Sequence, residues 1–301
     1  MQQTFILPDD YQGRVIATLF ERIAPSSDKA ILYIHGYIDY FFQEHLAEHF
    51  NKAGYNFYAL ELRKYGRSLL PHQRAFYCRS LTEYFPEIDL ALQTINGEGC
   101  KEISLMGHST GGLTTSLYMS QGRERGRVNS LILNSPFFEF NTHWFNRNIS
   151  IPLSAFISRL FPYAHKAGEL SEHLAASMHL SMKGEWEYDL AMKPAADVPL
   201  DFAWLGAVRA GQRQLKKGLH INVPVLVMYS SKSIWSKQWG DDFLRGDSVL
   251  NVRDIAHYAP RLGADVTQVE IEDGMHDLTL SRKDVREKVF ETMLNFLQSN
   301  H

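Results

Sequence analysis

The stretch "SLMGHSTGGLTTSLYM", Ser104–Met119, sets one serine, Ser109, among three glycines. Residues Gly107–Gly111 match the pattern G-x-S-x-G, in which a sharp strand-to-helix turn exposes a nucleophilic serine. The pattern alone is weak, because a chain of this length contains it by chance about one time in ten. A strand-like run precedes the serine and a helix-like run follows it, and this context favours a nucleophile. The alternative is a glycine-rich turn in which Ser109 only caps the helix.

Short apolar runs along the chain are typical of strands that are buried on both faces of a parallel sheet. Segments with helical spacing lie between these runs, and this alternation predicts an α/β domain. In the first 24 residues two apolar runs flank "PDDYQG", which predicts an antiparallel hairpin at the sheet edge. The other strand-like runs are Ile31–Ile34, Phe57–Leu60, Ile103–Met106, Leu131–Asn134, Val225–Tyr229 and Val266–Ile271.

The alternation stops between Phe138 and Asn222, where the chain is aromatic and helix-prone and shows no convincing buried strand. We expect a helical cap over residues 138–222, inserted before the penultimate strand of a core that residues 1–137 and 223–301 form. The alternative is a set of helices packed beneath the sheet. Near the C-terminus Ser281 precedes a helical segment and Asp284 follows three residues later, which predicts a capping box.

The overall composition is that of an ordinary globular protein, and the charge pattern does not suggest nucleic-acid binding. The net charge is −3, and no long run carries one sign of charge. No stretch approaches the roughly 18 apolar residues of a membrane span, and no secretory signal is expected. Cys78 and Cys100 lack C-x-x-C spacing, so we expect reduced thiols in a cytoplasmic protein. No cofactor or metal is expected, and the chain is expected to be a monomer or a homodimer.

A serine nucleophile needs two backbone N–H groups that hold the oxyanion of a tetrahedral intermediate. One is expected from Thr110, the residue after the serine. The other is expected from Tyr37, because "ILYIHGYIDYFF" places His35-Gly36 directly after a buried strand, and Gly36 permits a close turn. The His35 side chain is interpreted as a structural loop residue rather than as a base.

Two segments together carry a family resemblance. "HGYIDYFFQEHLAEHFNKAGYNFYALELRKYGRS", His35–Ser68, followed by "GHSTGG", resembles the α/β-hydrolase superfamily, and within it the monoacylglycerol lipase, lysophospholipase and serine-aminopeptidase-like branch. That branch carries an H-G loop, a G-H-G-x-S-like turn (here Lys64–Ser68) and G-H-S-x-G. The resemblance covers nearly the whole chain except the insertion, which corresponds to a variable cap. It implies an α/β-hydrolase fold, with a mostly parallel eight-stranded sheet flanked by helices, and the hydrolysis of esters or lipids, with peptidases as a minority.

In this fold the catalytic residues follow the order serine, then Asp or Glu, then histidine. The base is expected in the loop after the last strand, and His276 is the only histidine there. His257 falls within the preceding predicted helix, and His108 lies on a different part of the elbow. His276 is therefore predicted to take the proton of Ser109.

The acid departs from the family pattern. The position just after "VPVLVMYS" holds Ser231, Lys232 and Ser233 instead of a carboxylate. Asp247 is favoured, because it precedes a short apolar turn and a predicted helix, as the family acid does. It also lies 29 residues before His276, which leaves room for a helix and a strand.

Other carboxylates stay open as the acid. With Asp247 chosen, residues 231–246 become an insertion ahead of the acid loop, and Asp241 and Asp242 within it remain rivals. Asp277 adjoins His276, but its side chain would have to turn back sharply to orient the imidazole.

Three functions are compatible with these residues. The first is hydrolysis of a small lipid-like ester, such as a monoacylglycerol or lysophospholipid, by a Ser109–His276–Asp247 triad. The second is an aminopeptidase, which would hold the substrate amine with Glu169, Glu172, Glu185 or Glu187, and the third is a non-catalytic binding module. A haloalkane dehalogenase is disfavoured because the elbow residue is a serine. Cap aromatics favour an apolar acyl or alkyl pocket: Phe138, Phe140, Trp144, Phe145, Phe156, Phe161, Trp186, Tyr188 and Trp204.

Overall fold

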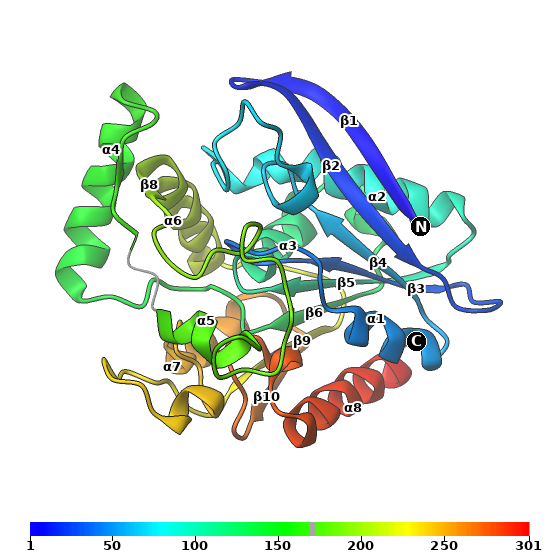
Figure 1. The fold of residues 1–301 in the computed structure, drawn as a ribbon. Helices are drawn as coiled ribbons and strands as arrows, with labels where there is room; N and C mark the ends of the chain where they lie inside the picture. The colour runs from blue at the N-terminus through cyan, green and yellow to red at the C-terminus, as the bar shows by residue number, and fades with distance from the viewer. Residues whose placement is uncertain (169–171, 301) are drawn as a thin grey trace.

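The computed structural model describes residues 1–168 and 172–300. Its main sheet has eight strands in the order β1-β2-β4-β3-β5-β6-β9-β10 (Figure 1). β2 runs antiparallel to β1 and β4, and every other neighbouring pair is parallel. The strands are β1 (Gln2–Asp10), β2 (Gly13–Arg22), β3 (Lys29–Ile34), β4 (Asn56–Glu61), β5 (Glu102–His108), β6 (Ser130–Asn134), β9 (Val225–Ser230) and β10 (Val266–Ile271).

This architecture is the α/β-hydrolase fold, so the predicted fold class is confirmed. The N-terminal residues form the predicted hairpin at one edge of the sheet. All six apolar runs are strands. β3, β4, β5, β6 and β9 are buried on both faces and need no polar side. The expected burial on both faces is wrong for Val266–Ile271, because β10 is the edge strand and is only partly buried.

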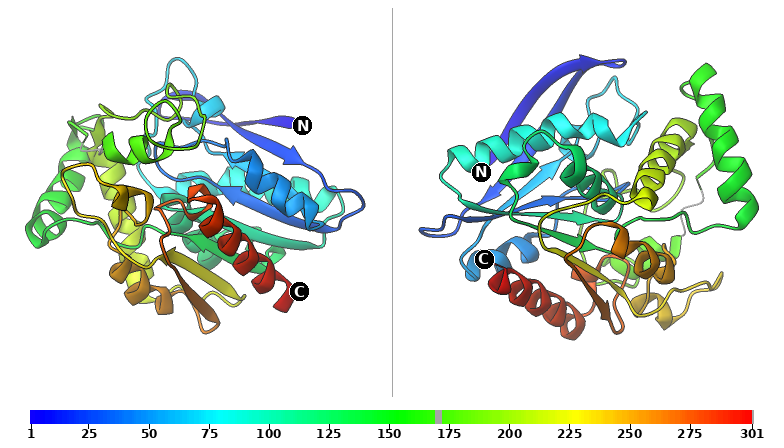
Figure 2. Two further views of the ribbon diagram at one scale, coloured as in Figure 1. Left: turned by 60° about the horizontal axis from the view of Figure 1, so that its bottom comes forward. Right: turned by 180° about the vertical axis from the view of Figure 1, so that it is seen from behind.

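Helices cover the sheet in two layers, each with its own apolar core. α1 and α8 lie side by side on one face (Figure 2) and enclose one core. α2, α3, α6 and α7 contribute to the larger core on the other face. The helices are α1 (Glu44–Lys52), α2 (Phe85–Gly97), α3 (Thr110–Gln121), α4 (Ile151–Leu160), α5 (Glu172–Met178), α6 (Phe202–Lys217), α7 (Val252–Tyr258) and α8 (Lys283–Ser299).

Residues 138–222 lie between β6 and β9 and carry α4, α5 and α6. α6 buries Trp204, Val208 and Leu215 in the larger core and packs against α3 and α4. α4 lies outside α6 at the periphery (Figures 1 and 2). A two-stranded sheet of β7 (His165–Lys166) and β8 (Leu200–Asp201) was not predicted, since two-residue strands show no recognisable alternation. The division into core and cap stays a prediction.

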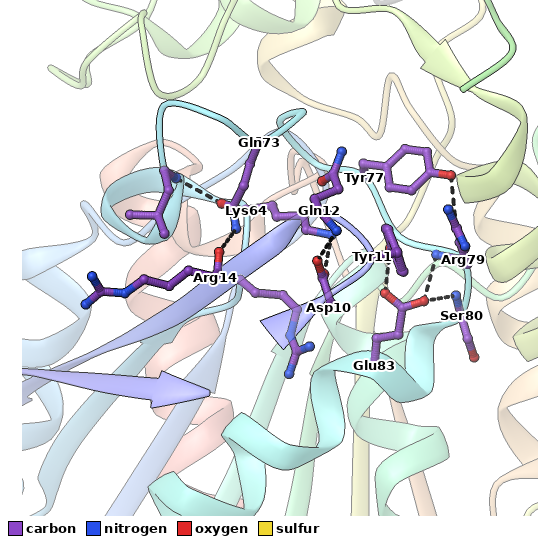
Figure 3. Close-up of polar contacts among 12 residues, drawn as sticks. Asp10, Tyr11, Gln12, Arg14, Lys64, Gln73, Tyr77, Arg79, Ser80 and Glu83 are labelled. Carbon is purple, nitrogen blue, oxygen red and sulfur yellow. Dashed lines mark hydrogen bonds and ion pairs between the residues drawn. The ribbon is translucent and has the colours of Figure 1, made fainter. Parts of the chain in front are cut away.

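Lys64, which follows β4, is a buried cation beside the tip of the N-terminal hairpin (Figure 3). The Lys64 Nζ lies 2.6 Å from an Asp10 carboxylate oxygen and 4.3 Å from the centre of the Tyr11 ring. The Tyr11 hydroxyl in turn donates a hydrogen bond of 2.8 Å to Glu83, just before α2. Lys64 has a left-handed backbone, with φ of +67°. The ion pair with Lys64 therefore attaches the hairpin to the core, and Lys64 adopts a backbone conformation that is usual for glycine.

Two sequence-based expectations concern the membrane and the thiols. Cys78 and Cys100 are buried and neither forms a disulfide. Within residues 1–168 and 172–300, every helix is too short or too polar to cross a bilayer.

Candidate active site

Ser109 lies at the turn between β5 and α3. Its φ of +52° and ψ of −117° are strained for a non-glycine residue. Two backbone hydrogen bonds hold the turn: Ser109 N–H donates to the Asn134 carbonyl at 3.0 Å, and Phe137 N–H donates to the Ser109 carbonyl at 2.9 Å. A Cβ on Gly111 would lie 2.2 Å from the His35 carbonyl oxygen, so only glycine fits there. Gly111 thus allows the elbow to pack against the His35 loop.

Ser109, His276 and Asp247 form a chain of hydrogen bonds. Ser109 Oγ lies 3.0 Å from His276 Nε2, and His276 Nδ1 lies 2.9 Å from Asp247 Oδ2. Asp247 is fully buried, and Ser109 and His276 are each 7% exposed. In this arrangement the imidazole can accept the serine proton while its other N–H donates to the carboxylate. The structure thus brings together the three residues that the sequence singled out.

The acid loop explains how Asp247 reaches the histidine. Asp247 pairs with Ser233 in an isolated parallel bridge: Asp247 N–H donates to the Lys232 carbonyl, and Ile234 N–H donates to the Asp247 carbonyl. Residues 234–246 form a loop that starts and ends at this bridge, shortly after β9. Asp247 Oδ1 accepts the N–H groups of Val249 and Leu250 at 2.8 and 2.7 Å. These bonds fix the carboxylate so that Oδ2 faces His276.

The rival carboxylates lie elsewhere. Asp241 and Asp242 are exposed in a short 3-10 turn, and Asp242 lies 3.7 Å from Lys232. Neither lines the cavity that contains Ser109.

Asp277 is buried in a separate network beside the site. Its Oδ1 accepts hydrogen bonds from Asn134 Nδ2 at 2.7 Å and from the Thr279 hydroxyl at 2.7 Å. Burial alone would raise the pKa of Asp277, but the interaction with His108 and the hydrogen bonds from Thr279 and Asn134 lower it to about 2. Asp277 therefore stays ionised and orders the loop that follows His276.

The predicted capping role of Ser281 is wrong. α8 begins at Lys283, and its N-cap residue is Arg282, which makes no side-chain capping bond. The Ser281 hydroxyl instead accepts the N–H of Met275 at 2.9 Å. The Met275 N–H is buried and therefore needs a hydrogen-bond partner, and Met275 directly precedes His276. The serine therefore helps to position the histidine rather than the helix.

Tyr37 and Thr110 both line the cavity of Ser109. Within the described part of the chain, neither backbone N–H has a hydrogen-bond partner. The buried His35 ring accepts the Leu62 N–H at 3.1 Å, and its pKa is lowered by burial. His35 thus holds the loop of Tyr37 against the end of β4 and lies too deep in the loop to serve as a base.

Ser109 and His276 line a cavity of about 180 Å³ whose wall is largely apolar. Its polar lining residues include Lys193, whose Nζ lies 2.6 Å from Asp39 Oδ1. Asp39 Oδ2 and the Tyr188 hydroxyl are buried and have no hydrogen-bond partner among the described residues. The apolar wall includes Tyr37, Phe137, Leu174, Met178, Trp204 and Leu250.

A second cavity, of about 350 Å³, shares part of this wall and extends toward α4. Small polar residues of α4 and of the preceding turn line it, whereas the apolar residues Ile149, Leu153 and Leu160 are exposed. Of the nine predicted pocket aromatics, Tyr188 lines the first cavity, Phe140 lines the second, and Trp204 lines both. Trp144, Phe145, Phe156 and Phe161 each expose more than half of their surface instead.

The acidic residues considered for binding a substrate amine do not reach Ser109. Glu172, Glu185 and Glu187 are exposed and do not line its cavity, and Glu185 pairs with Arg286. Glu169 lies outside the described residues. In the described part of the chain, His, Cys, Asp and Glu side chains form no group of three that could hold a metal ion.

Comparison with known proteins places this arrangement in a family. A sequence profile described as serine aminopeptidase, S33, matches residues 25–280. The chain belongs to the serine aminopeptidase S33 family. The match to the S33 family spans both β5 with the elbow and the loop of His276. No curated protein matches the chain in sequence.

Solved structures share the fold at low sequence identity. A monoacylglycerol lipase from Paleococcus ferrophilus superimposes with a TM-score of 0.71 at 18% identity, over 94% of this chain and 99% of the lipase. A soluble variant of a monoglyceride lipase from Saccharomyces cerevisiae, in complex with a substrate analogue, gives 0.72 at 14%, over 100% and 97%. Est1E from Butyrivibrio proteoclasticus, with ferulic acid bound, gives 0.57 at 15%, over 95% and 96%. These likenesses establish the α/β-hydrolase fold of the S33 family member.

Proposed function

We propose that the protein is a serine hydrolase that cleaves a carboxylic ester with an apolar acyl or alkyl group. The observation that carries the proposal is the buried chain from Ser109 Oγ through His276 to Asp247, at the wall of a largely apolar cavity. Fold alone implies no activity. A strained serine, a histidine and a buried carboxylate in mutual hydrogen-bond reach are the parts that acyl transfer requires.

The proposed reaction proceeds through an acyl-enzyme. His276 removes the Ser109 proton as Oγ attacks the ester carbonyl carbon, and Asp247 stabilises the imidazolium that forms. The Tyr37 and Thr110 N–H groups hold the oxyanion of the tetrahedral intermediate, supported by the N-terminus of α3. His276 then returns the proton to the leaving alcohol. Water, activated by the same imidazole, releases the acid and restores Ser109.

The lining of the Ser109 cavity supports a substrate with both apolar and polar groups. Its apolar side chains suit an acyl or alkyl chain. The unpartnered Asp39 Oδ2 and Tyr188 hydroxyl suit a hydroxyl-bearing group. Names of structural relatives, two lipases of monoacylglycerols and one protein with bound ferulic acid, agree with ester substrates of this kind.

The family description favours a second candidate, an aminopeptidase. Such an enzyme needs a free carboxylate near Ser109 to bind the substrate amine. Asp39 lies in the cavity, but its charge is already paired with Lys193. We therefore rank the esterase first.

Ser109→Ala provides the test. The substitution should lower p-nitrophenyl ester hydrolysis by more than about 10³-fold and abolish fluorophosphonate labelling. Ser236→Ala, in an exposed loop, is the matched control and should behave as the wild type. Labelling that persists in Ser109→Ala would refute the nucleophile. Faster cleavage of aminoacyl nitroanilides than of acyl esters by the wild type would favour the peptidase.

A further inference from the structure

A third cavity, of about 410 Å³, is separate from Ser109 and His276 and is rich in cations. It lies between α6, the residues that follow β6, and Tyr258 at the end of α7. Four lining side chains are cationic and one is a carboxylate, so positive charge exceeds negative charge in its wall. The cationic cavity is lined by Glu139, Phe140, Thr142, Trp144, Arg147, Asn148, Arg209, Gln212, Arg213, Lys216 and Tyr258.

Two of the four cations are neutralised within the protein. The Glu139 carboxylate, 5% exposed, pairs with Lys216 and lies 3.5 Å from Arg147. Arg147 also lies 3.3 Å from Asp254. Lys216 further packs over the Tyr258 ring, 5.0 Å from its centre. These contacts account for all the carboxylate charge at the cationic cavity.

The other two cations, Arg209 and Arg213, have no such partner. They occupy successive turns on one face of α6, four residues apart, where like charges repel. Among the residues that the structure describes, neither guanidinium makes an ion pair or a hydrogen bond. Burial and the neighbouring Arg213 lower the pKa of Arg209, and Glu139 opposes this shift. Arg209 is half-buried and Arg213 is exposed, so an anion between the two guanidinium groups would offset their repulsion.

We propose that the cationic cavity binds a ligand through a phosphate group held between Arg209 and Arg213. Guanidinium groups present paired donors that match the oxygens of a phosphate, and two of them neutralise a multiply charged oxyanion. Trp144 and Tyr258 provide aromatic surface for the remainder of the ligand. The cationic cavity includes neither Ser109 nor His276 in its lining.

Binding is tested with inorganic pyrophosphate, titrated calorimetrically into the full chain at low ionic strength. Sodium chloride of equal ionic strength serves as the blank. The wild type should bind one equivalent, and the Arg209→Gln/Arg213→Gln double variant should bind at least about tenfold more weakly. Arg123→Gln, an exposed arginine just after α3, is the matched control and should bind as the wild type does. Arg213→Gln alone alters an exposed side chain and gives the same answer if the double variant is unstable.

A second arm distinguishes a soluble phosphate compound from a lipid headgroup. The same proteins are sedimented with phosphatidylcholine vesicles that contain or lack phosphatidic acid. Binding to the acidic vesicles that the double substitution abolishes supports the site and assigns the phosphate to a lipid. Pyrophosphate binding without vesicle binding supports the site and assigns a soluble ligand. The proposal is overturned if the wild type binds neither probe, or if the double variant binds as well as the wild type.

Discussion

Asp247 stands beside Ser233 in a parallel bridge, although the two residues are separated by an exposed loop. Ser233 occupies the place where the family pattern expects a carboxylate, and its hydroxyl donates to the Leu250 carbonyl at 2.8 Å. The bridge therefore places the Asp247 carboxylate beside the position where the family pattern expects one, although Asp247 comes later in the sequence.

Asp247→Asn tests this assignment. The amide cannot stabilise the imidazolium and favours the wrong tautomer of His276, so kcat for ester hydrolysis should fall by about 10⁴-fold. Asp242→Asn, in the exposed 3-10 turn, should retain wild-type kcat. Steady-state kinetics of the two purified variants decide the matter, and a large loss in Asp242→Asn with little loss in Asp247→Asn would reassign the acid.

Glycine substitutions test the packing of the elbow. In Gly111→Ala the new Cβ would lie 2.2 Å from the His35 carbonyl oxygen and 2.6 Å from that of Ile34, both backbone atoms. We expect a loss of about 2–3 kcal/mol in the free energy of unfolding, together with lost activity. Gly97→Ala, at the end of α2 with nothing within 4 Å, should gain up to about 1 kcal/mol. Urea unfolding measures both, and equal stability of the two variants would contradict the close approach.

Buried histidines should make stability depend on pH. Burial lowers the pKa values of His35 and His108 below their ordinary 6.5. The unfolded chain then binds more protons than the folded chain just below pH 6.5, so the free energy of unfolding should fall as the pH drops through that value. Above it these groups are neutral in both states and contribute no slope. Urea midpoints that stay constant from pH 7.5 to about pH 5 would count against this expectation.

Asp10→Asn tests the buried ion pair at the hairpin tip. The substitution leaves the Lys64 ammonium without a counter-charge in a buried position, which costs about 3–5 kcal/mol. Asp9→Asn changes the neighbouring exposed carboxylate and should have almost no effect. Thermal unfolding of the two variants measures the difference. Similar melting temperatures would contradict a stabilising role for the Lys64–Asp10 ion pair.

The sheet could be predicted because strands covered on both faces are continuous apolar runs. The elbow and the histidine loop follow from the same logic, since both come directly after such strands. The spacing to His276 and the apolar turn at Val249-Leu250 favour Asp247 as the acid. The roles of these residues in catalysis stay predictions.

Other features depend on contacts between distant segments and leave no local trace. Ser281 resembles a helix cap in sequence, and only the position of Met275 shows what its hydroxyl does. The sequence of α4 is that of an ordinary amphipathic helix and does not indicate that Leu153 and Leu160 are exposed. In sequence, Arg209 and Arg213 resemble charged residues on a solvated helix face. Only the structure shows that the nearby Glu139 is paired with Arg147 and Lys216 instead.

The left-handed backbone of Lys64 carries a consequence for variation among relatives. The family turn has a glycine at this position, for which such a backbone has no steric cost. A chain with that glycine has no internal ammonium, so the Asp10 carboxylate loses its ion-pair partner, whereas Tyr11 keeps its hydrogen bond to Glu83. Positions 10 and 64 are therefore expected to covary, and position 11 should vary independently of them.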